Sequence, residues 1–381
     1  MKILGDKIRQ ARVLRGKSIT ELAVELGVSK QAVFQYENDI TEPKREVIFR
    51  LTGVLDFPVN FFTTPYATEI RKSNTFFRAN LTASKSEKMS LEERAALVAY
   101  FYDFLQEYLD MLVLNIPKYD DTELDEKDYE TIAMKARAFW ELGNGPILNM
   151  VSLLEENGVV LSTVKVTDKK IDAFTQPHNK NIFCVIIEDT KHSMVRRNFT
   201  LAHELGHILM HSSASFDELE KEAKKRIEDE ANLFAASFLL PRNAFIQDLR
   251  DPHDLDFYIY LKRKWHVSIL AMIMRARSLR LIDEKSYMSL IKKYNYRRYR
   301  LNEPLDDIIT IKKPVLFEQS LRLLLDSGHL TIDALMSNMA LQGLAMSEKD
   351  IIDFFALEND FFTPYSQPKN MGIALKAKFD S

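Results

Sequence analysis

The sequence predicts a mostly helical α+β protein, and three observations support this fold class. Apolar residues recur at helical spacing through most of the 381 residues. Between about 158 and 189 the pattern changes to three short runs rich in β-branched and aromatic residues. The hydrophobic fraction of 46% and the charged fraction of 28% are ordinary for a globular chain. We therefore expect an all-α N-terminal domain, a central α+β domain with a small β-sheet, and a C-terminal helical region.

Changes in composition divide the chain into four expected segments. These are an N-terminal domain over 1–64, a connector over 65–130, a central domain over 131–295 and a C-terminal helical region over 296–381. The connector begins with the basic residues Arg71, Lys72 and Arg78 and continues into a helix expected over 91–116. It ends in the acidic stretch KYDDTELDEKDYE, which is typical of a solvated linker or an exposed helix start.

Charge and cysteine content limit the class of protein. The formal net charge is −3, so any contact with DNA must come from a local basic patch. The single cysteine, Cys184, excludes an internal disulfide and suits a reducing compartment. The opening MKILGDKIRQ does not resemble a signal peptide, and the longest apolar runs are too short to cross a bilayer. We expect a cytoplasmic protein without membrane contact.

Residues 18–37, SITELAVELGVSKQAVFQYE, predict two short helices joined by a tight turn. Gly27 stands where the first helix needs a left-handed ending, and Ser29 stands where the second needs an N-cap. The second helix would project outward the residues that meet DNA in such motifs, namely Ser29, Lys30, Gln31, Phe34 and Gln35. Glutamine can pair with adenine, and lysine can reach guanine or phosphate.

A local basic face accompanies this motif. It would consist of Lys7, Arg9, Arg12, Arg15 and Lys17. With these features, residues 4–62 resemble the XRE/Cro-type helix-turn-helix domain, which implies DNA binding. Many members carry glutamine at the second residue of the first motif helix, whereas this chain has Ile19, which puts one DNA contact in doubt. A helical domain used only for protein contact is the alternative.

The stretch FTLAHELGHILMH at 199–211 predicts a metal site on a helix. His203 and His207 are four residues apart, so both imidazoles can face one ion. Zinc accepts imidazole and carboxylate ligands in a tetrahedral site and leaves one position to water when the site is catalytic. Glu204 is offset by about 100° around the helix, where it can reach that water as a general base. Taken alone, the motif also fits an ordinary buried helix.

A third ligand is expected on the next helix. His211 lies another turn along the first helix, too far from an ion that His203 and His207 already hold. In the following helix Glu230 interrupts an apolar stripe, and a carboxylate there needs a partner to offset its desolvation. That stripe consists of Leu219, Ala223, Ile227, Phe234 and Phe238. We predict Glu230 as the third ligand, with Glu228 and Asp229 solvated.

Two stretches together, RRNFTLAHELGHILMH and EDEANLFAASFLLP, resemble the signature of the ImmA/IrrE family of metallopeptidases over roughly 130–280. The resemblance implies a gluzincin-like domain in which His203, His207 and Glu230 bind Zn2+ and Glu204 is the base. Gluzincins also carry an aspartate four residues after the ligand glutamate, where this chain has Phe234. Orientation of a zinc histidine is therefore expected from elsewhere.

The same resemblance implies that a substrate chain pairs with an edge strand of the sheet. Residues 181–189, NIFCVIIED, are the candidate edge, and an interior strand is the alternative. The remaining histidines are expected to have no metal role; they are His178, His192, His253, His266 and His329.

Together the two resemblances imply a helix-turn-helix domain fused to a zinc endopeptidase. We expect it to cleave a protein, foremost a transcriptional repressor, in a stress response or in the regulation of a mobile element. The alternative is a DNA-binding regulator whose peptidase-like domain senses without cutting, and Glu204 favours catalysis over this. A toxin–antitoxin partner is a weaker third hypothesis. The C-terminal helices are expected to pack, while sensing and homodimer formation stay open.

Overall fold

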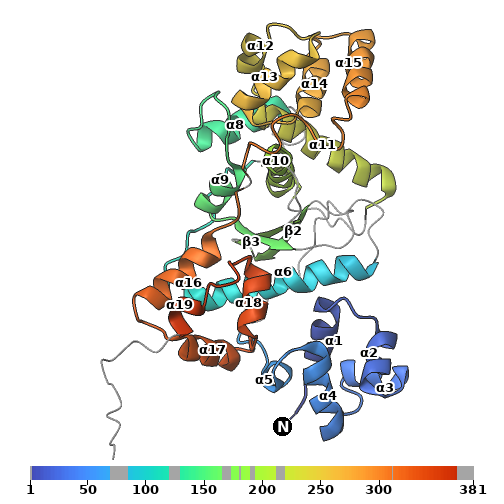
Figure 1. Ribbon diagram of the computed structural model, residues 1–381, viewed down its shortest axis with the longest axis vertical. Helices are drawn as coiled ribbons and strands as arrows, with labels where there is room; N and C mark the ends of the chain where they lie inside the picture. The colour runs from blue at the N-terminus through green and yellow to red at the C-terminus, as the bar shows by residue number, and fades with distance from the viewer. Residues whose placement is uncertain are drawn as a thin grey trace, which may run out of the picture. The chain divides into compact units, whose positions relative to one another are not determined.

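The computed structural model describes residues 2–68, 85–119, 129–164, 173–179, 182–188, 194–211, 219–310 and 312–366. It confirms a mostly helical α+β chain with a small sheet (Figure 1). The chain divides into two compact units. One contains the described residues of 1–12, 19–67 and 317–381, and the other those of 13–18 and 68–316. The expected basic cluster Arg71, Lys72 and Arg78 and most of the acidic stretch lie outside the described residues.

The helices fall into three groups along the chain. Before the sheet they are α1 (Gly5–Leu14), α2 (Ile19–Leu26), α3 (Lys30–Glu37), α4 (Arg45–Leu55), α5 (Val59–Thr63), α6 (Lys85–Gln106), α8 (Tyr129–Phe139) and α9 (Met150–Glu156). After the sheet they are α10 (Met194–Met210), α11 (Lys221–Leu239), α12 (Arg242–Asp248), α13 (Leu255–Trp265), α14 (Ile269–Ser278) and α15 (Glu284–Tyr296). The last group is α16 (Leu316–Asp326), α17 (Ile332–Leu341), α18 (Glu348–Phe355) and α19 (Thr363–Ser366). No helix among the described residues is long and apolar enough to cross a membrane.

The two helices of the expected helix-turn-helix motif are α2 and α3, and the turn between them is as predicted. Gly27 has a φ of 63°, the left-handed conformation that glycine adopts without a steric penalty. The Ser29 side chain accepts a hydrogen bond from the Ala32 backbone N–H at 3.1 Å, which caps α3. The sequence therefore specifies this motif through local backbone chemistry.

One local structure occurs twice in the unit that holds this motif, first after α4 and again after α18. The residues that cap the C-terminal ends of α4 and α18, Asp56 and Ala356, are both in the left-handed conformation. Each end is followed by a buried aromatic pair in edge-to-face contact, Phe61 with Phe62 and Phe361 with Phe362. The aromatic pairs anchor the chain after each helix by burying a large apolar area.

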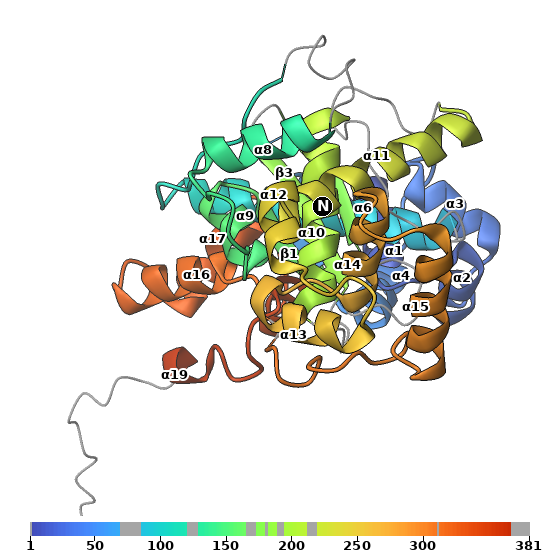
Figure 2. The ribbon, with the colours of Figure 1, turned by 90° about the horizontal axis from the view of Figure 1, so that it is seen from above.

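The sheet has three strands in the order β1 (Val160–Val164), β3 (Ile182–Glu188), β2 (Ala173–Asn179). Strand β3 pairs in parallel with β1 and antiparallel with β2. The expectation that 181–189 forms the edge is therefore wrong, and its interior alternative is correct: β3 is the central strand, and β2 lies at an edge of the described sheet. Helix α10 lies on one face of this sheet and α6 on the other (Figures 1 and 2).

Helix α6 ends at Gln106, ten residues before the expected end at 116. The chain that follows pairs with other segments instead of continuing the helix. The Tyr102 hydroxyl donates to the Leu112 carbonyl at 3.1 Å, and the Asn115 backbone N–H donates to the Asn157 carbonyl at 2.9 Å. These long-range hydrogen bonds outweigh the helical propensity of the apolar stretch.

Buried Glu155 at the end of α9 fixes the start of α16. Its carboxylate accepts hydrogen bonds from the backbone N–H groups of Val315 and Leu316 at 3.0 Å. Burial raises the pKa of Glu155 to about 7, and the two backbone hydrogen bonds oppose that rise. The group therefore binds its proton more tightly in the folded chain than in the unfolded chain.

This raised pKa predicts a pH dependence of stability. The contribution of Glu155 is fully present below pH 4.5 and is lost as the pH rises through 7, by up to about 3 kcal/mol. A Glu155→Gln variant is neutral at every pH, so its stability relative to wild type should increase between pH 4.5 and 8. Chemical denaturation of both proteins at several pH values measures this difference. An unchanged difference across that range would contradict the assignment.

Candidate metal centre and nucleic-acid interface

Helices α10 and α11 carry the candidate metal centre and pack closely against each other. The contact is at Gly206, where a Cβ atom would lie 3.0 Å from Phe234 Cδ1 and 3.3 Å from the Ala231 Cα. Glycine at this position lets the two backbones approach. On the side of α10 that carries the motif, His203, Glu204 and His207 are all buried.

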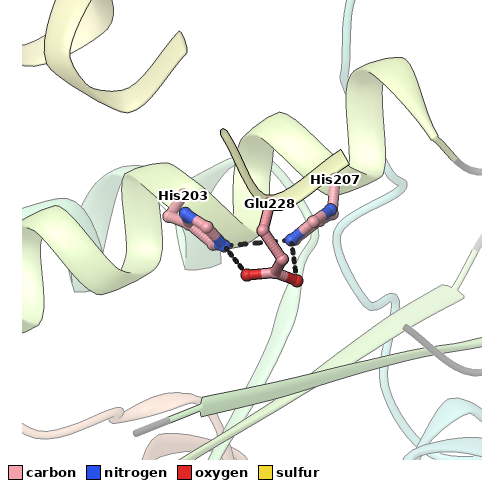
Figure 3. Close-up of side chains that lie close together, drawn as sticks. All are labelled: His203, His207 and Glu228. Carbon is pink, nitrogen blue, oxygen red and sulfur yellow. Dashed lines mark hydrogen bonds and ion pairs between the residues drawn. The ribbon is translucent and has the colours of Figure 1, made fainter. Parts of the chain in front are cut away.

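Three side chains from these helices converge (Figure 3). The Nε2 atoms of His203 and His207 are 3.0 Å apart. The two Glu228 carboxylate oxygens lie 3.3 Å from His203 Nε2 and 3.5 Å from His207 Nε2. Within the described residues, these three side chains form the group whose ligand atoms all lie within 4.8 Å of one another.

The carboxylate in this group is Glu228, whereas the sequence predicts Glu230 as the third ligand. Helix α11 packs against α10 on one side and against α8 on another, so it has two buried faces. Glu230 is partly buried on a different face and contacts His211, with 3.0 Å between Oε2 and His211 Nε2. Burial of a carboxylate alone therefore cannot identify which glutamate faces the histidines.

The outward nitrogen atoms of both histidines also have hydrogen-bond partners. His203 Nδ1 lies 2.9 Å from Asn232 Oδ1, and His207 Nδ1 lies 3.1 Å from His211 Nδ1. Asn232 follows Glu228 by four residues and therefore lies on the same face of α11. With Glu228 at the site, Asn232 holds the place four residues later that the orienting aspartate has in gluzincins.

The donor atoms fit a zinc ion. An amide oxygen only accepts hydrogen bonds, so the proton of neutral His203 is on Nδ1 and its Nε2 lone pair faces the cluster. A nitrogen lone pair and carboxylate oxygens facing each other at 3.3 Å repel unless a proton or a metal cation lies between them. Ligand atoms of tetrahedral zinc are about 3.3 Å apart for metal–ligand bonds near 2.05 Å. The observed separations of 3.0 to 3.5 Å match this value.

Electrostatics keep the Glu228 carboxylate ionised. Burial alone would raise its pKa, but when His203 and His207 are charged and no ion is bound, their protonated Nε2 atoms outweigh burial and hold the pKa well below its usual range. A metal ligand must be deprotonated, so Glu228 meets this requirement before any ion binds.

Glu204 directly follows His203 on α10, and the sheet orients its side chain. Its side chain is fully buried on α10, and its Oε2 atom accepts a hydrogen bond from the Thr175 hydroxyl on β2. Thr175 was not identified from the sequence, because its contact with Glu204 depends on how the edge strand lies against α10. His253, His266 and His329 are not part of the metal group, while His192 and the side chain of His178 lie outside the part of the chain that the structure describes.

The exposed face of α3 agrees with the expected DNA-reading surface. Ser29, Lys30, Gln31 and Phe34 are exposed, and Gln35 is half-buried. Phe34 is 51% exposed, which is unusual for a large apolar side chain and leaves it available for contact with a ligand.

Two members of the expected basic face are buried and must be removed from it. The Lys7 Nζ atom donates to the Gly343 carbonyl at 2.7 Å and lies over the Tyr66 ring. The Arg12 guanidinium is paired with Glu37, where its Nη2 atom donates to Oε2 at 2.9 Å. Both cations take part in packing, since each is at least nine-tenths buried. Arg9 is exposed, and Arg15 and Lys17 are partly exposed.

Comparison with known families agrees with both parts of the chain. Residues 154–277 match the family model described as the IrrE N-terminal-like domain, a peptidase family, and residues 8–62 match the Helix-turn-helix family model. The chain therefore joins a helix-turn-helix domain to an IrrE-like, peptidase-type domain. No curated protein matches the chain.

The geometry predicts different metal affinities for two neighbouring acidic variants. Glu228→Gln should weaken zinc binding by more than the roughly 10- to 100-fold that loss of an outer hydrogen-bond partner costs, because it removes a charged ligand. Asp229→Asn, at the exposed neighbouring position, should bind zinc as wild type does. Competition with a chelator of known affinity measures both. Equal affinities would exclude Glu228 as a ligand.

The exposed position of Lys30 on α3 predicts that loss of its charge weakens DNA binding. Lys30→Ala should weaken binding to a random-sequence duplex and reduce the slope of log affinity against log salt by about one. Lys349→Ala, an exposed lysine on α18, serves as the matched control and should leave affinity and slope unchanged. Fluorescence anisotropy at several salt concentrations gives both quantities. If both variants behave alike, Lys30 does not contact DNA.

Proposed function

We propose that this chain is a zinc-dependent endopeptidase that cleaves a protein substrate and uses its helix-turn-helix domain to bind DNA. The observation that carries the proposal is the placement of Glu204 beside the group formed by His203, His207 and Glu228. This is an arrangement of two histidines, one carboxylate and one adjacent base with which zinc-dependent peptidases hydrolyse peptides.

The metal ligands in this proposal are His203, His207 and Glu228. A bound Zn2+ would supply a Lewis acid that activates water and polarises the peptide carbonyl. The chain's own residues supply ligands of the right type, two imidazole nitrogens and an ionised carboxylate. The outer contacts from Asn232 and His211 keep the ligating nitrogen of each ring directed at the cluster.

Proton transfer is the role of Glu204. Its carboxylate takes the proton of the attacking water and gives it to the leaving amine nitrogen. The Thr175 hydroxyl donates to Oε2 and so fixes the orientation of this carboxylate in a buried site. In a buried site such a fixed acceptor has a stronger electrostatic effect than it would have in water.

The edge strand β2 is the surface that we propose for binding the substrate backbone. It pairs with β3 along one side, and Thr175 links it directly to Glu204. An extended peptide added to this edge would form backbone hydrogen bonds like those of a further strand. Such binding recognises the backbone of the substrate more than its side chains. This mode of binding suits a protein substrate with an accessible extended segment.

A transcriptional repressor is the substrate that best connects the two halves of the chain. The helix-turn-helix domain would bring the peptidase domain to DNA, where a DNA-bound repressor is present at high local concentration. Cleavage would then release the genes that the repressor controls, as in a stress response or the activation of a mobile element. DNA binding is supported by the match of residues 8–62 and by the exposed face of α3.

The role of Glu204 predicts a separation of binding from catalysis. Glu204→Gln should retain zinc binding but lower the cleavage rate by a factor of about 10² to 10⁴, because it removes the proton acceptor. Cells that express the wild-type chain should contain new protein N-termini that are depleted in cells with the variant. Mass spectrometry of N-terminal peptides measures them, and Glu222→Gln, at an exposed position of α11, is the control.

The outcome also distinguishes the proposal from a regulator that does not cut. If the zinc-loaded wild type and Glu204→Gln yield the same set of N-termini and the same cellular response, the domain does not act as a peptidase. A sensor that only binds would show this result.

A further inference from the structure

A second group of polar side chains lies behind the metal group and is connected to it. His211, the residue after α10, has its Nδ1 atom 3.1 Å from His207 Nδ1 and its Nε2 atom 3.0 Å from Glu230 Oε2. The Tyr129 hydroxyl on α8 also hydrogen-bonds to Glu230. His207 and His211 are each more than nine-tenths buried. These contacts form a continuous chain from Tyr129 to His207.

The hydrogen-bonding capacity of each group fixes where the protons are. A carboxylate only accepts, so the Nε2 atom of His211 must carry a proton and donate it to Glu230. In a neutral imidazole the other nitrogen is then an acceptor, so His211 Nδ1 accepts from His207 Nδ1. His207 therefore has its proton on Nδ1, and its Nε2 lone pair points toward His203 and Glu228.

We propose that His211 and Glu230 are positioning residues that act as a relay of two hydrogen bonds, setting the tautomer and ring orientation of His207 for metal binding. The inference rests on the proposed zinc site, because it concerns how one of its ligands is held. Glu230 thus supports the metal centre through His211 and His207 and is not itself a ligand of the ion. Outer partners of this kind raise the basicity of a ligating imidazole and fix its direction.

The surroundings of Glu230 are arranged to hold its carboxylate toward His211. Burial, together with the charge and hydrogen bond of Glu230, raises the pKa of Tyr129 to about 12, so its hydroxyl remains a donor. Arg226 contributes little, because its Nε atom is 3.9 Å from Glu230 Oε1 and its side chain is 65% exposed. His203 has a separate and simpler support, the Asn232 side chain. The two metal histidines are therefore held by independent contacts.

Zinc affinity of the full chain tests the relay. His211→Phe keeps a ring of similar size but removes the acceptor, and it should weaken zinc binding by about 10- to 100-fold. Glu230→Gln should weaken it less, because the amide oxygen can still accept from His211. The double variant should bind zinc no more weakly than His211→Phe, since both residues act through one path. His253→Phe, at an exposed position, is the control and should match wild type.

The tautomer of His211 gives a readout that a merely structural role would not change. In the zinc-loaded wild type labelled with ¹⁵N-histidine, His211 should have a protonated Nε2 and a bare Nδ1 in long-range nitrogen–proton spectra. Its signals are identified as those missing from His211→Gln. A protonated Nδ1 on His211 would overturn the relay, and this measurement holds even if His211→Phe fails to fold.

Failure of the relay can be told from failure of the proposed function. If His211→Phe and Glu230→Gln bind zinc as wild type does, or if their losses simply add, the relay is wrong, while Glu204→Gln still decides peptidase activity. If the wild-type protein does not bind zinc, or if Glu228→Gln binds zinc as tightly as wild type does, the proposed metal site itself is wrong. If His211→Phe binds zinc more weakly than wild type, and Glu204→Gln yields the same cleavage products as wild type, the relay is supported and the peptidase function is rejected.

Discussion

The close contact between α10 and α11 at Gly206 is the constraint on which the metal centre depends. Two histidines on one helix can face the same direction, but they cannot complete a metal site without a carboxylate from elsewhere. Helix α11 supplies Glu228 at the required place because its backbone approaches α10 where residue 206 has no side chain. The same approach brings Asn232 to His203, so one packing contact places both a proposed ligand, Glu228, and the residue that orients a second proposed ligand.

The sheet contributes the second half of the site. Edge strand β2 supplies Thr175, which orients Glu204, and the same strand offers backbone groups to an extended peptide. The proposed base and the proposed substrate edge are thus joined where α10 contacts β2. The helix-turn-helix motif belongs to a different compact unit and has its own exposed polar face on α3. Separate units can bind DNA and hydrolyse a peptide without sharing residues.

Local chemistry made much of this fold predictable. Helical and strand periodicities gave the fold class, while Gly27 and Ser29 marked the turn and cap of the helix-turn-helix motif through requirements of the backbone itself. Helix geometry likewise predicts that His203 and His207, four residues apart, face the same direction. The predictions that failed concern side chains whose partners are distant in the sequence. Lys7 and Arg12 are buried by Gly343 and Glu37, contacts that no local pattern reveals.

The third carboxylate shows the same limit within the site. Burial of a glutamate on α11 indicated a partner, but α11 is buried against both α8 and α10, so the partner could be on either side. Glu230 has its partner in His211, and Glu228, which the apolar stripe left out, faces the metal histidines. The hydrogen-bond network of the folded chain separates a ligand from a residue that supports one.

An anomalous diffraction map of the zinc-loaded protein, collected on both sides of the zinc absorption edge, tests the central claim most directly. The account predicts a peak that appears only above the edge, bounded by His203 Nε2, His207 Nε2 and Glu228, with Glu230 still in contact with His211. A peak ligated by Glu230, or a zinc-loaded protein with no peak at these histidines, would contradict it.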